Sequence, residues 1–176
     1  MEIRFYKPTV LDIPKMQELV RPEVEKGIIL LRTEDEMATT IRSYIVVEVD
    51  GKMAGFTATH IHSARMAEVR SLIVNEEFRG LGLGKKLVEK CVEEAKFYGI
   101  KQVLSLTYEK DFFNSCGFRE IPKEDIPEQK IWADCIKCKL FPICNEIAVV
   151  NDIDFYFLVS IILFRRSSFV NFWDIF

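Results

Sequence analysis

The sequence lacks an excess of positive charge, a signal-peptide pattern in its first residues and an apolar run long enough to span a membrane. Its formal net charge is −3, so no nucleic-acid footprint is expected. The first residues, MEIRFYKPTV, have no signal-peptide pattern. The uncharged apolar stretch at residues 155–164 has ten residues, whereas a membrane-spanning helix needs about 20. We therefore expect no nucleic-acid partner and no transmembrane span.

Disulfide signals are also missing. The chain has five cysteines, an odd number, and no secretory segment precedes them. This favours reduced thiols and a cytoplasmic protein. A length of 176 residues with 49% hydrophobic residues is ordinary for one globular domain with a substantial core.

The most informative stretch is residues 68–98. Residues 68–74 are rich in β-branched and apolar residues and predict a strand. Residues 83–98 predict a helix, because their apolar residues recur at helical spacing. The loop between them reads Arg79-Gly80-Leu81-Gly82-Leu83-Gly84. Glycines let the backbone approach a ligand closely, and the following helix N-terminus offers unpaired N–H groups and positive charge. The arrangement predicts a phosphate-binding loop.

Two common phosphate-binding motifs do not fit this loop. A Walker loop needs Gly-Lys followed by Ser or Thr, but Lys86 follows Gly84-Lys85. A dinucleotide fingerprint needs G-x-G-x-x-G, whereas Gly80, Gly82 and Gly84 are spaced by two. The remaining alternatives are a plain glycine-rich turn and the pattern R-x-x-G-x-G, which Arg79, Gly82 and Gly84 satisfy.

The pattern R-x-x-G-x-G resembles the pyrophosphate loop of the GNAT superfamily of acetyl-CoA-dependent N-acetyltransferases. The resemblance implies an enzyme with acetyl-CoA as cosubstrate. It also implies that the preceding strand hydrogen-bonds pantetheine and that a backbone N–H near Ile73 or Val74 polarises the thioester carbonyl. The expected cofactor-binding residues are Ile73, Val74, Arg79, Gly80, Leu81, Gly82, Leu83, Gly84 and Lys85.

The order of predicted elements agrees with this superfamily. Strands are expected at 3–6, 44–49, 52–61, 65–74 and 103–106, with a further strand after Gly117-Phe118. Helices are expected after Thr9 or Asp12, after Thr33, at 83–98 and at 111–116, and Pro22 predicts that the first of them breaks or kinks soon after it. The predicted fold class is α+β: a GNAT fold whose mixed, mostly antiparallel central sheet is flanked by helices.

Several segments resemble, more narrowly, the acetyltransferase domain of N-acetylglutamate synthases of the short single-domain type. These segments are Leu19-Val20-Arg21-Pro22, Leu31-Arg32, Glu68-Val69-Arg70-Ser71-Leu72 and Trp132-Ala133-Asp134-Cys135. The resemblance covers residues 1–148 and implies a GNAT domain there, acetylating the α-amine of L-glutamate in arginine biosynthesis. Arginine binds carboxylates in a bidentate way. The candidate substrate-binding residues are therefore Arg21, Arg32 and Arg70, with surface ion pairs as the alternative.

The chemistry needs a base for the acceptor ammonium and an acid for the leaving thiolate. Glu68 is the candidate catalytic base, acting through a water, and a solvated carboxylate facing Arg70 is the alternative. Many superfamily members place a tyrosine four residues before the Gly-Phe pair, where this sequence has Phe113. Either Tyr108 or Ser115 substitutes as the acid, or the thiolate leaves without direct help.

Three late cysteines form the pattern Cys135-x2-Cys138-x5-Cys144. A structural zinc ion needs four ligands, and no fourth lies at a diagnostic spacing. A zinc site, redox chemistry and three reduced thiols in a terminal loop therefore remain as alternatives. His60 and His62 are expected to be polar strand residues.

Residues 149–176 form an apolar C-terminal tail of unknown role. An extra strand, a homo-oligomer contact, a membrane-surface anchor and non-native sequence from a shifted reading frame all fit it. Three rivals to a glutamate acetyltransferase also remain. They are an acetyltransferase for another small amine or amino acid, a non-catalytic acyl-CoA-binding regulator, and a zinc-stabilised interaction protein.

Overall fold

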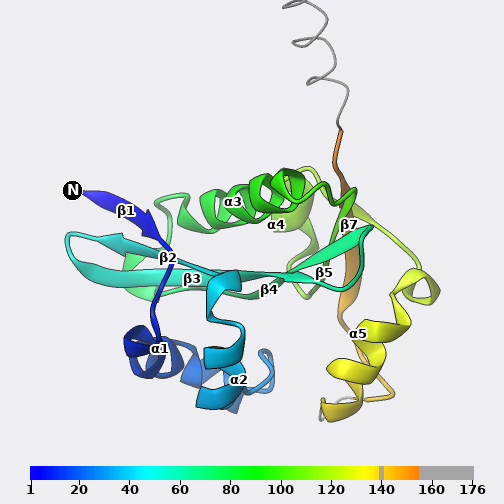
Figure 1. Ribbon diagram of the computed structural model, residues 1–176, viewed down its shortest axis with the longest axis horizontal. Helices are drawn as coiled ribbons and strands as arrows, with labels where there is room; N and C mark the ends of the chain where they lie inside the picture. The colour runs from blue at the N-terminus through cyan, green and yellow to red at the C-terminus, as the bar shows by residue number, and fades with distance from the viewer. Residues whose placement is uncertain (139–140, 155–176) are drawn as a thin grey trace, which may run out of the picture.

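The computed structural model describes residues 1–138 and 141–154, in which seven strands form one sheet in the order β1-β2-β3-β4-β5-β7-β6. The β4–β5 pair is parallel and every other pair is antiparallel. Helices α3 and α4 cover one face, and α1, α2 and α5 lie on the other (Figure 1). The predicted α+β class with a mixed, mostly antiparallel sheet is confirmed. The strands are β1 (Ile3–Tyr6), β2 (Tyr44–Val49), β3 (Lys52–Ile61), β4 (Met66–Val74), β5 (Gln102–Thr107), β6 (Arg119–Glu120) and β7 (Ile147–Asp152), and the helices are α1 (Ile13–Glu25), α2 (Glu34–Thr39), α3 (Leu83–Phe97), α4 (Lys110–Ser115) and α5 (Glu128–Ala133).

Local signals in the sequence explain several element ends. Thr33 and Glu36 form a complete capping box at the start of α2. Asp50 and Gly51 both have positive φ, at 49° and 80°, which is the geometry of a tight hairpin turn between β2 and β3. Gly99 lies just beyond the C-terminal end of α3 and has φ 75°. A glycine in this left-handed conformation commonly ends a helix.

Three details of the structure go beyond the sequence-based expectations. Helix α1 includes Pro22 and ends soon after it, at Glu25, where a break or kink was expected. Strand β7 and helix α5 were not expected, although the run Ile147-Ala148-Val149-Val150 has strand character. β7 ends at Asp152, so the last strand of the sheet contains residues on both sides of the boundary predicted after residue 148. The rest of the predicted tail, residues 155–176, lies outside the described part of the chain.

Strands β4 and β5 part in the middle of the sheet. Their ladder pairs only Met66, Ala67 and Glu68 with Gln102, Val103 and Leu104. Beyond this point β4 continues along β3, and β5 continues along β7. The gap between the two strands opens directly after Glu68.

A β-bulge interrupts β4 just past this opening. Arg70 pairs with Ala58 and Ile73 pairs with Phe56, so Thr57 alone faces both Ser71 and Leu72. Ser71 has φ 54°, a left-handed conformation that few non-glycine residues adopt and that is common at functional sites. The extra residue returns Leu72 to the α3 side, where Val69 also packs, and Ile73 to the α1 side.

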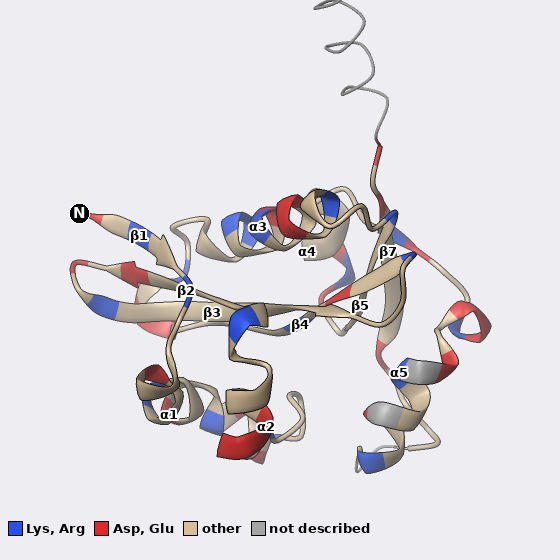
Figure 2. Ribbon diagram, viewed as in Figure 1, with Lys and Arg blue, Asp and Glu red and all other residues tan. Residues whose placement is uncertain are grey.

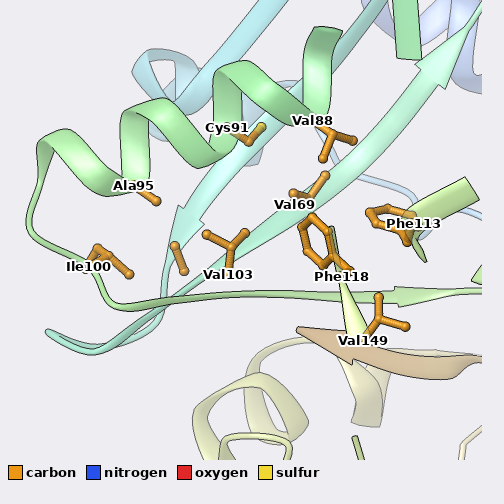
Figure 3. Packing of buried hydrophobic residues seen from close by; sticks show 10 residues of the cluster. Val69, Val88, Cys91, Ala95, Ile100, Val103, Phe113, Phe118 and Val149 are labelled. Carbon is orange, nitrogen blue, oxygen red and sulfur yellow. The ribbon is translucent and has the colours of Figure 1, made fainter. Parts of the chain in front are cut away.

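The core lies on both faces of the sheet. Under α3 and α4, Val69, Val88, Cys91 and Phe118 belong to one buried cluster (Figure 3). Nearer the start of α3, Leu83 and Leu87 pack on Val47 and other apolar side chains of β2 and β3. The predicted apolar stripe of α3 is confirmed, because Leu83, Leu87, Val88, Cys91 and Ala95 are all buried. None of the helices in the described ranges has both the length and the apolar character that a membrane crossing requires.

Replacing Leu87 with Ala should lower the free energy of unfolding by about 2–5 kcal/mol, because a fully buried leucine is removed from a packed core. Urea unfolding followed by circular dichroism measures this loss. Phe97→Ala on the same helix is the matched control, since Phe97 is 84% exposed, and it should change stability by less than about 0.5 kcal/mol. Equal losses in the two variants would contradict the core described here.

Candidate active site

One large cavity of about 1400 Å³ runs from the glycine loop along β4 to α5. Its lining includes the start of α3, the diverging halves of β4 and β5, and residues of the segment before α2. The loop and the charged side chains of β4 therefore open into the same space. Figure 2 marks the charged positions on β4 and on the helices to either side of the sheet.

The glycine loop has the shape that a phosphate group needs. Gly80 and Gly82 have φ values of 81° and 71°, and a Cβ built at either position would meet no atom within 4 Å. Gly82 is the N-cap of α3, so the first N–H groups of a 15-residue helix point into this open space. At Gly84 a Cβ would come within 3.3 Å of the Phe112 ring, which explains the third glycine. These features fit a pyrophosphate.

The expected cofactor-binding residues are largely brought together. Leu81 is not part of the cavity lining, whereas the others are: Ile73, Val74, Arg79, Gly80, Gly82, Leu83, Gly84 and Lys85. Leu83 contributes backbone, because its side chain is buried in the core under α3. Arg79 and Lys85 are exposed, and an Arg79 Nη1 atom lies 3.5 Å from a Glu76 carboxylate oxygen.

Glu68 lies at the point where β4 and β5 part, and its carboxylate is buried. It accepts hydrogen bonds from Arg70 Nη2 at 3.1 Å, and Lys130 Nζ of α5 lies 2.6 Å from its Oε1 atom. His62 Nε2 lies 2.9 Å from its other oxygen. The expectation that His62 is simply a polar strand residue therefore misses its partner.

Asp134, directly after α5, is the second buried carboxylate of the group. Its two oxygens accept from two different arginines: Arg32 Nη2 at 2.6 Å and Arg70 Nη2 at 2.5 Å. Lys130 Nζ is 3.0 Å from the same carboxylate. Three cationic side chains thus share two carboxylates, so this group of five has a formal charge of +1, with Glu146 elsewhere in the lining of the same cavity.

The neighbours determine the charge state of each carboxylate. Burial alone would raise the pKa of Glu68, but the Lys130 ammonium, the His62 hydrogen bond and Arg70 outweigh burial and hold that pKa well below its usual range. The same balance holds at Asp134. Burial would raise its pKa, but Lys130, Arg70 and Arg32 outweigh burial and lower that pKa. The pKa of Lys130 is raised, because Glu68 and Asp134 outweigh its burial. All three side chains are therefore ionised at neutral pH.

Arg21 does not join this group. It lines a second, smaller cavity of about 260 Å³ together with Arg32 and Ser71. Of the three arginines, Arg32 is the one that borders both cavities, which also share Ser71 and four apolar residues: Val24, Ile29, Leu30 and Leu31. Of the three arginines singled out in the sequence, Arg32 and Arg70 converge and Arg21 lies apart.

The cysteine pattern does not form a metal site in the structure. Within residues 1–138 and 141–154, no three His, Cys, Asp or Glu residues are arranged to hold a metal ion. Cys144 Sγ instead lies 3.5 Å from a Glu146 carboxylate oxygen. None of the five cysteines, all of which lie in the described ranges, forms a disulfide, and the structure does not support a zinc ion on Cys135, Cys138 and Cys144.

Phe113, which stands where many members of the superfamily have a tyrosine acid, is part of the core. The Phe113 ring is buried and packs edge-on against Phe112 and Phe118. Tyr108 and Ser115 both line the large cavity, as the sequence-based alternatives require. The Ser115 hydroxyl, however, donates to the Phe112 carbonyl at 2.7 Å.

Sequence reasoning missed Lys130 altogether, and it included Asp134 only as part of the segment Trp132-Ala133-Asp134-Cys135, without a role of its own. Their i,i+4 spacing is the one available signal, since it puts an ammonium and a carboxylate on the same side of a helix. Glu146 was missed in the same way. It lines the cavity, and burial raises its pKa.

Comparison with known proteins gives relatives over most of the chain. Residues 13–119 match the model of the acetyltransferase (GNAT) family. An uncharacterized N-acetyltransferase of Chlorobaculum tepidum is 40% identical over 126 residues, which are 72% of this chain and 81% of that protein. An amino-acid acetyltransferase of Aeromonas salmonicida is 31% identical over 69% of this chain but only 28% of its own length.

A solved structure agrees with the fold. The N-acetylglutamate synthase of Neisseria gonorrhoeae, complexed with coenzyme A and N-acetyl-glutamate, superposes with a TM-score of 0.76 at 23% identity. The match covers 88% of this chain and 36% of that protein. The family match, the relatives and the glycine loop at the start of α3 agree, and the chain belongs to the acetyltransferase (GNAT) family as an N-acetyltransferase.

Proposed function

We propose that this N-acetyltransferase moves the acetyl group of acetyl-CoA to the α-amine of L-glutamate. In the N-acetylglutamate synthases that the sequence resembles, this reaction is the first step of arginine biosynthesis. The observation that carries the proposal is the single cavity that joins the glycine loop to Arg32 and Arg70. A donor with phosphates and an acceptor with carboxylates both find matching groups there. A cytoplasmic location is part of the proposal, and cysteines that form no disulfide are consistent with it.

The relatives support the choice of substrate. The Aeromonas relative carries the name amino-acid acetyltransferase, and the Neisseria enzyme is solved with N-acetyl-glutamate. This chain spans only 28% and 36% of those two proteins. The glutamate assignment therefore rests on the charged groups of the cavity.

The residues around the loop fit the proposed donor, whose thioester supplies the acetyl group. Backbone N–H groups from Gly82 onward, with Lys85 nearby, would bind the pyrophosphate. Beyond Glu68, β4 no longer pairs with β5, and this edge of β4 would hydrogen-bond pantetheine as a further strand would. A backbone N–H at Ile73 or Val74 would donate to the carbonyl oxygen as negative charge develops on it.

The acceptor is proposed to bind through its carboxylates. The guanidinium groups of Arg32 and Arg70 converge on one carboxylate already, that of Asp134, so they are spaced to hold such a group. The excess positive charge of the cluster favours an acidic amino acid over a polyamine. Attack of the amine nitrogen forms the C–N bond and breaks the C–S bond, and the amine proton passes to a base.

Glu68 is our proposed base, acting through a water at the mouth of the gap between β4 and β5. The cations around Glu68 keep it ionised but also weaken it as a proton acceptor. Glu146 is the rival, because a carboxyl group with a raised pKa in the same cavity is a better base at neutral pH. For the leaving thiolate, Tyr108 is the better candidate acid, since the Ser115 hydroxyl already donates to the Phe112 carbonyl.

One observation favours a second function, a non-catalytic acyl-CoA-binding regulator. Phe113 is buried among aromatic rings and has no proton to give. An unassisted thiolate is nevertheless tolerable, because the reference pKa of a thiol is about 8.5. A regulator would bind acetyl-CoA and release no CoA with any amine.

CoA release from acetyl-CoA should be fastest with L-glutamate in a panel of amino acids and polyamines. The reason is that only an acidic amino acid uses both the arginines and the excess positive charge. Thiol detection measures the rates. Turnover with another amine would overturn the glutamate assignment, and acetyl-CoA binding without any turnover would favour the regulator.

Arg32→Ala should raise the KM for the amino acid roughly tenfold to a hundredfold, because a charged hydrogen bond to a carboxylate is lost. The KM for acetyl-CoA should stay unchanged. Arg21→Ala is the matched control, since Arg21 lines only the smaller cavity. An unchanged amino-acid KM in Arg32→Ala would remove Arg32 from the acceptor site.

Glu68→Gln should lower kcat by about 10²–10⁴-fold if Glu68 takes the proton. Circular dichroism and the KM for acetyl-CoA establish that the variant is folded and binds its donor. Glu146→Gln is the paired measurement on the rival base. A large loss of kcat in Glu146→Gln, with little change in Glu68→Gln, would transfer the role to Glu146.

A further inference from the structure

Helix α5 presents an ammonium and a carboxylate to the proposed acceptor site. Lys130 Nζ and Asp134 Oδ2 are 3.0 Å apart and belong to residues four positions apart. Both side chains are buried against β4. An α-amino acid carries the same two groups, also close together, on a single carbon atom.

Each group contacts the residues that the acceptor would use. The Lys130 ammonium lies 2.6 Å from Glu68, where the acceptor amine would meet its proposed base. The Asp134 carboxylate accepts from Arg32 at 2.6 Å and from Arg70 at 2.5 Å, where a substrate carboxylate would bind. A second carboxylate at those guanidinium groups would compete for the same N–H donors and meet the charge of Asp134.

Polar contacts are the main attachment of α5 to the sheet. The four clusters of buried apolar side chains in the described residues include no described side chain from Glu128–Ala133. Trp132 of α5 is 69% exposed. Because the helix contributes so little apolar burial, exchanging its ionic contacts for those of a ligand costs little packing.

We propose that Lys130 and Asp134 occupy the acceptor site as an internal substitute for an amino acid, and that α5 leaves this position when the acceptor binds. The inference rests on the proposed function, because it assigns the same cavity to an amino acid. It names the ligand class as a zwitterion that offers both an ammonium and a carboxylate. It also gives α5 the role of a competitor that sets the apparent affinity for the acceptor.

Withdrawal of α5 has a consequence for the base. Lys130 is the strongest of the neighbours that lower the pKa of Glu68. The acceptor ammonium then takes the place of the Lys130 ammonium beside Glu68 and, unlike Lys130, carries the proton that the reaction must remove. Once that proton is lost, burial acts on Glu68 with less opposition and favours its protonated form.

The double variant K130Q/D134N tests this competition, because it keeps polar side chains but removes both charges. We expect the KM for the amino acid to fall, by up to roughly tenfold if α5 occupies the site about 90% of the time. The KM for acetyl-CoA should not change. K90Q/E93Q is the matched control, since Lys90 and Glu93 form an exposed ion pair on α3, and its kinetics should equal those of the unaltered protein. A higher amino-acid KM in K130Q/D134N would instead mean that Lys130 and Asp134 bind the substrate, and would overturn the proposal.

Binding without turnover separates this inference from the proposed function. Thermal shifts with each of the twenty amino acids, in the presence of CoA, should be larger for K130Q/D134N than for the unaltered protein with at least one amino acid. If that amino acid is not glutamate, the substrate assignment fails and the inference stands. Equal shifts, or none with any amino acid, would contradict the inference whatever the catalytic result.

Hydrogen exchange on the unaltered protein covers the case in which the double variant does not fold. Peptides containing residues 128–134 should exchange faster when the bound amino acid and CoA are present than with CoA alone. Peptides from α3 should not. Slower or unchanged exchange in α5 would overturn the proposal.

Discussion

The parting of β4 and β5 is the constraint on which the site depends. Three residue pairs hold the two strands together, and each strand then follows a different neighbour. A continuous ladder would use the β4 edge and close the cavity. The bulge at Ser71 adds to this effect, because it bends the strand and shifts the alternation of its side chains by one residue just before the glycine loop. Before the bulge, Glu68 and Arg70 border the cavity, while Val69 packs in the core.

Burying charged groups at this opening costs desolvation free energy, and their pairing with one another offsets that cost. Two carboxylates and three cations of the cluster are mostly shielded from water, and each side chain has at least one ionic partner there. Such a cluster is weak evidence for stability but strong evidence for a site, because apolar residues would pack there more cheaply. Its surplus positive charge is the basis on which we propose an anionic ligand.

Local chemistry made much of the fold predictable. The capping box at Thr33, the turn at Asp50-Gly51 and the apolar stripe of α3 each act within a few residues, and the structure has all three. The glycine loop was predictable for the same reason. The group of Arg32, Glu68, Arg70, Lys130 and Asp134 was only half predictable, because α5 reaches β4 across more than 60 residues of sequence. No short-range pattern indicates such a contact, and the separation of Arg21 from Arg32 was equally hidden.

A crystal structure with CoA and N-acetyl-L-glutamate tests the central claim most directly, namely that one cavity binds the donor at the glycine loop and an amino acid at the arginines. The account predicts pyrophosphate at Gly80–Gly84, a ligand carboxylate on Arg32 and Arg70, and α5 moved away from β4. A ligand carboxylate bound elsewhere, with Asp134 still on both arginines, would contradict it.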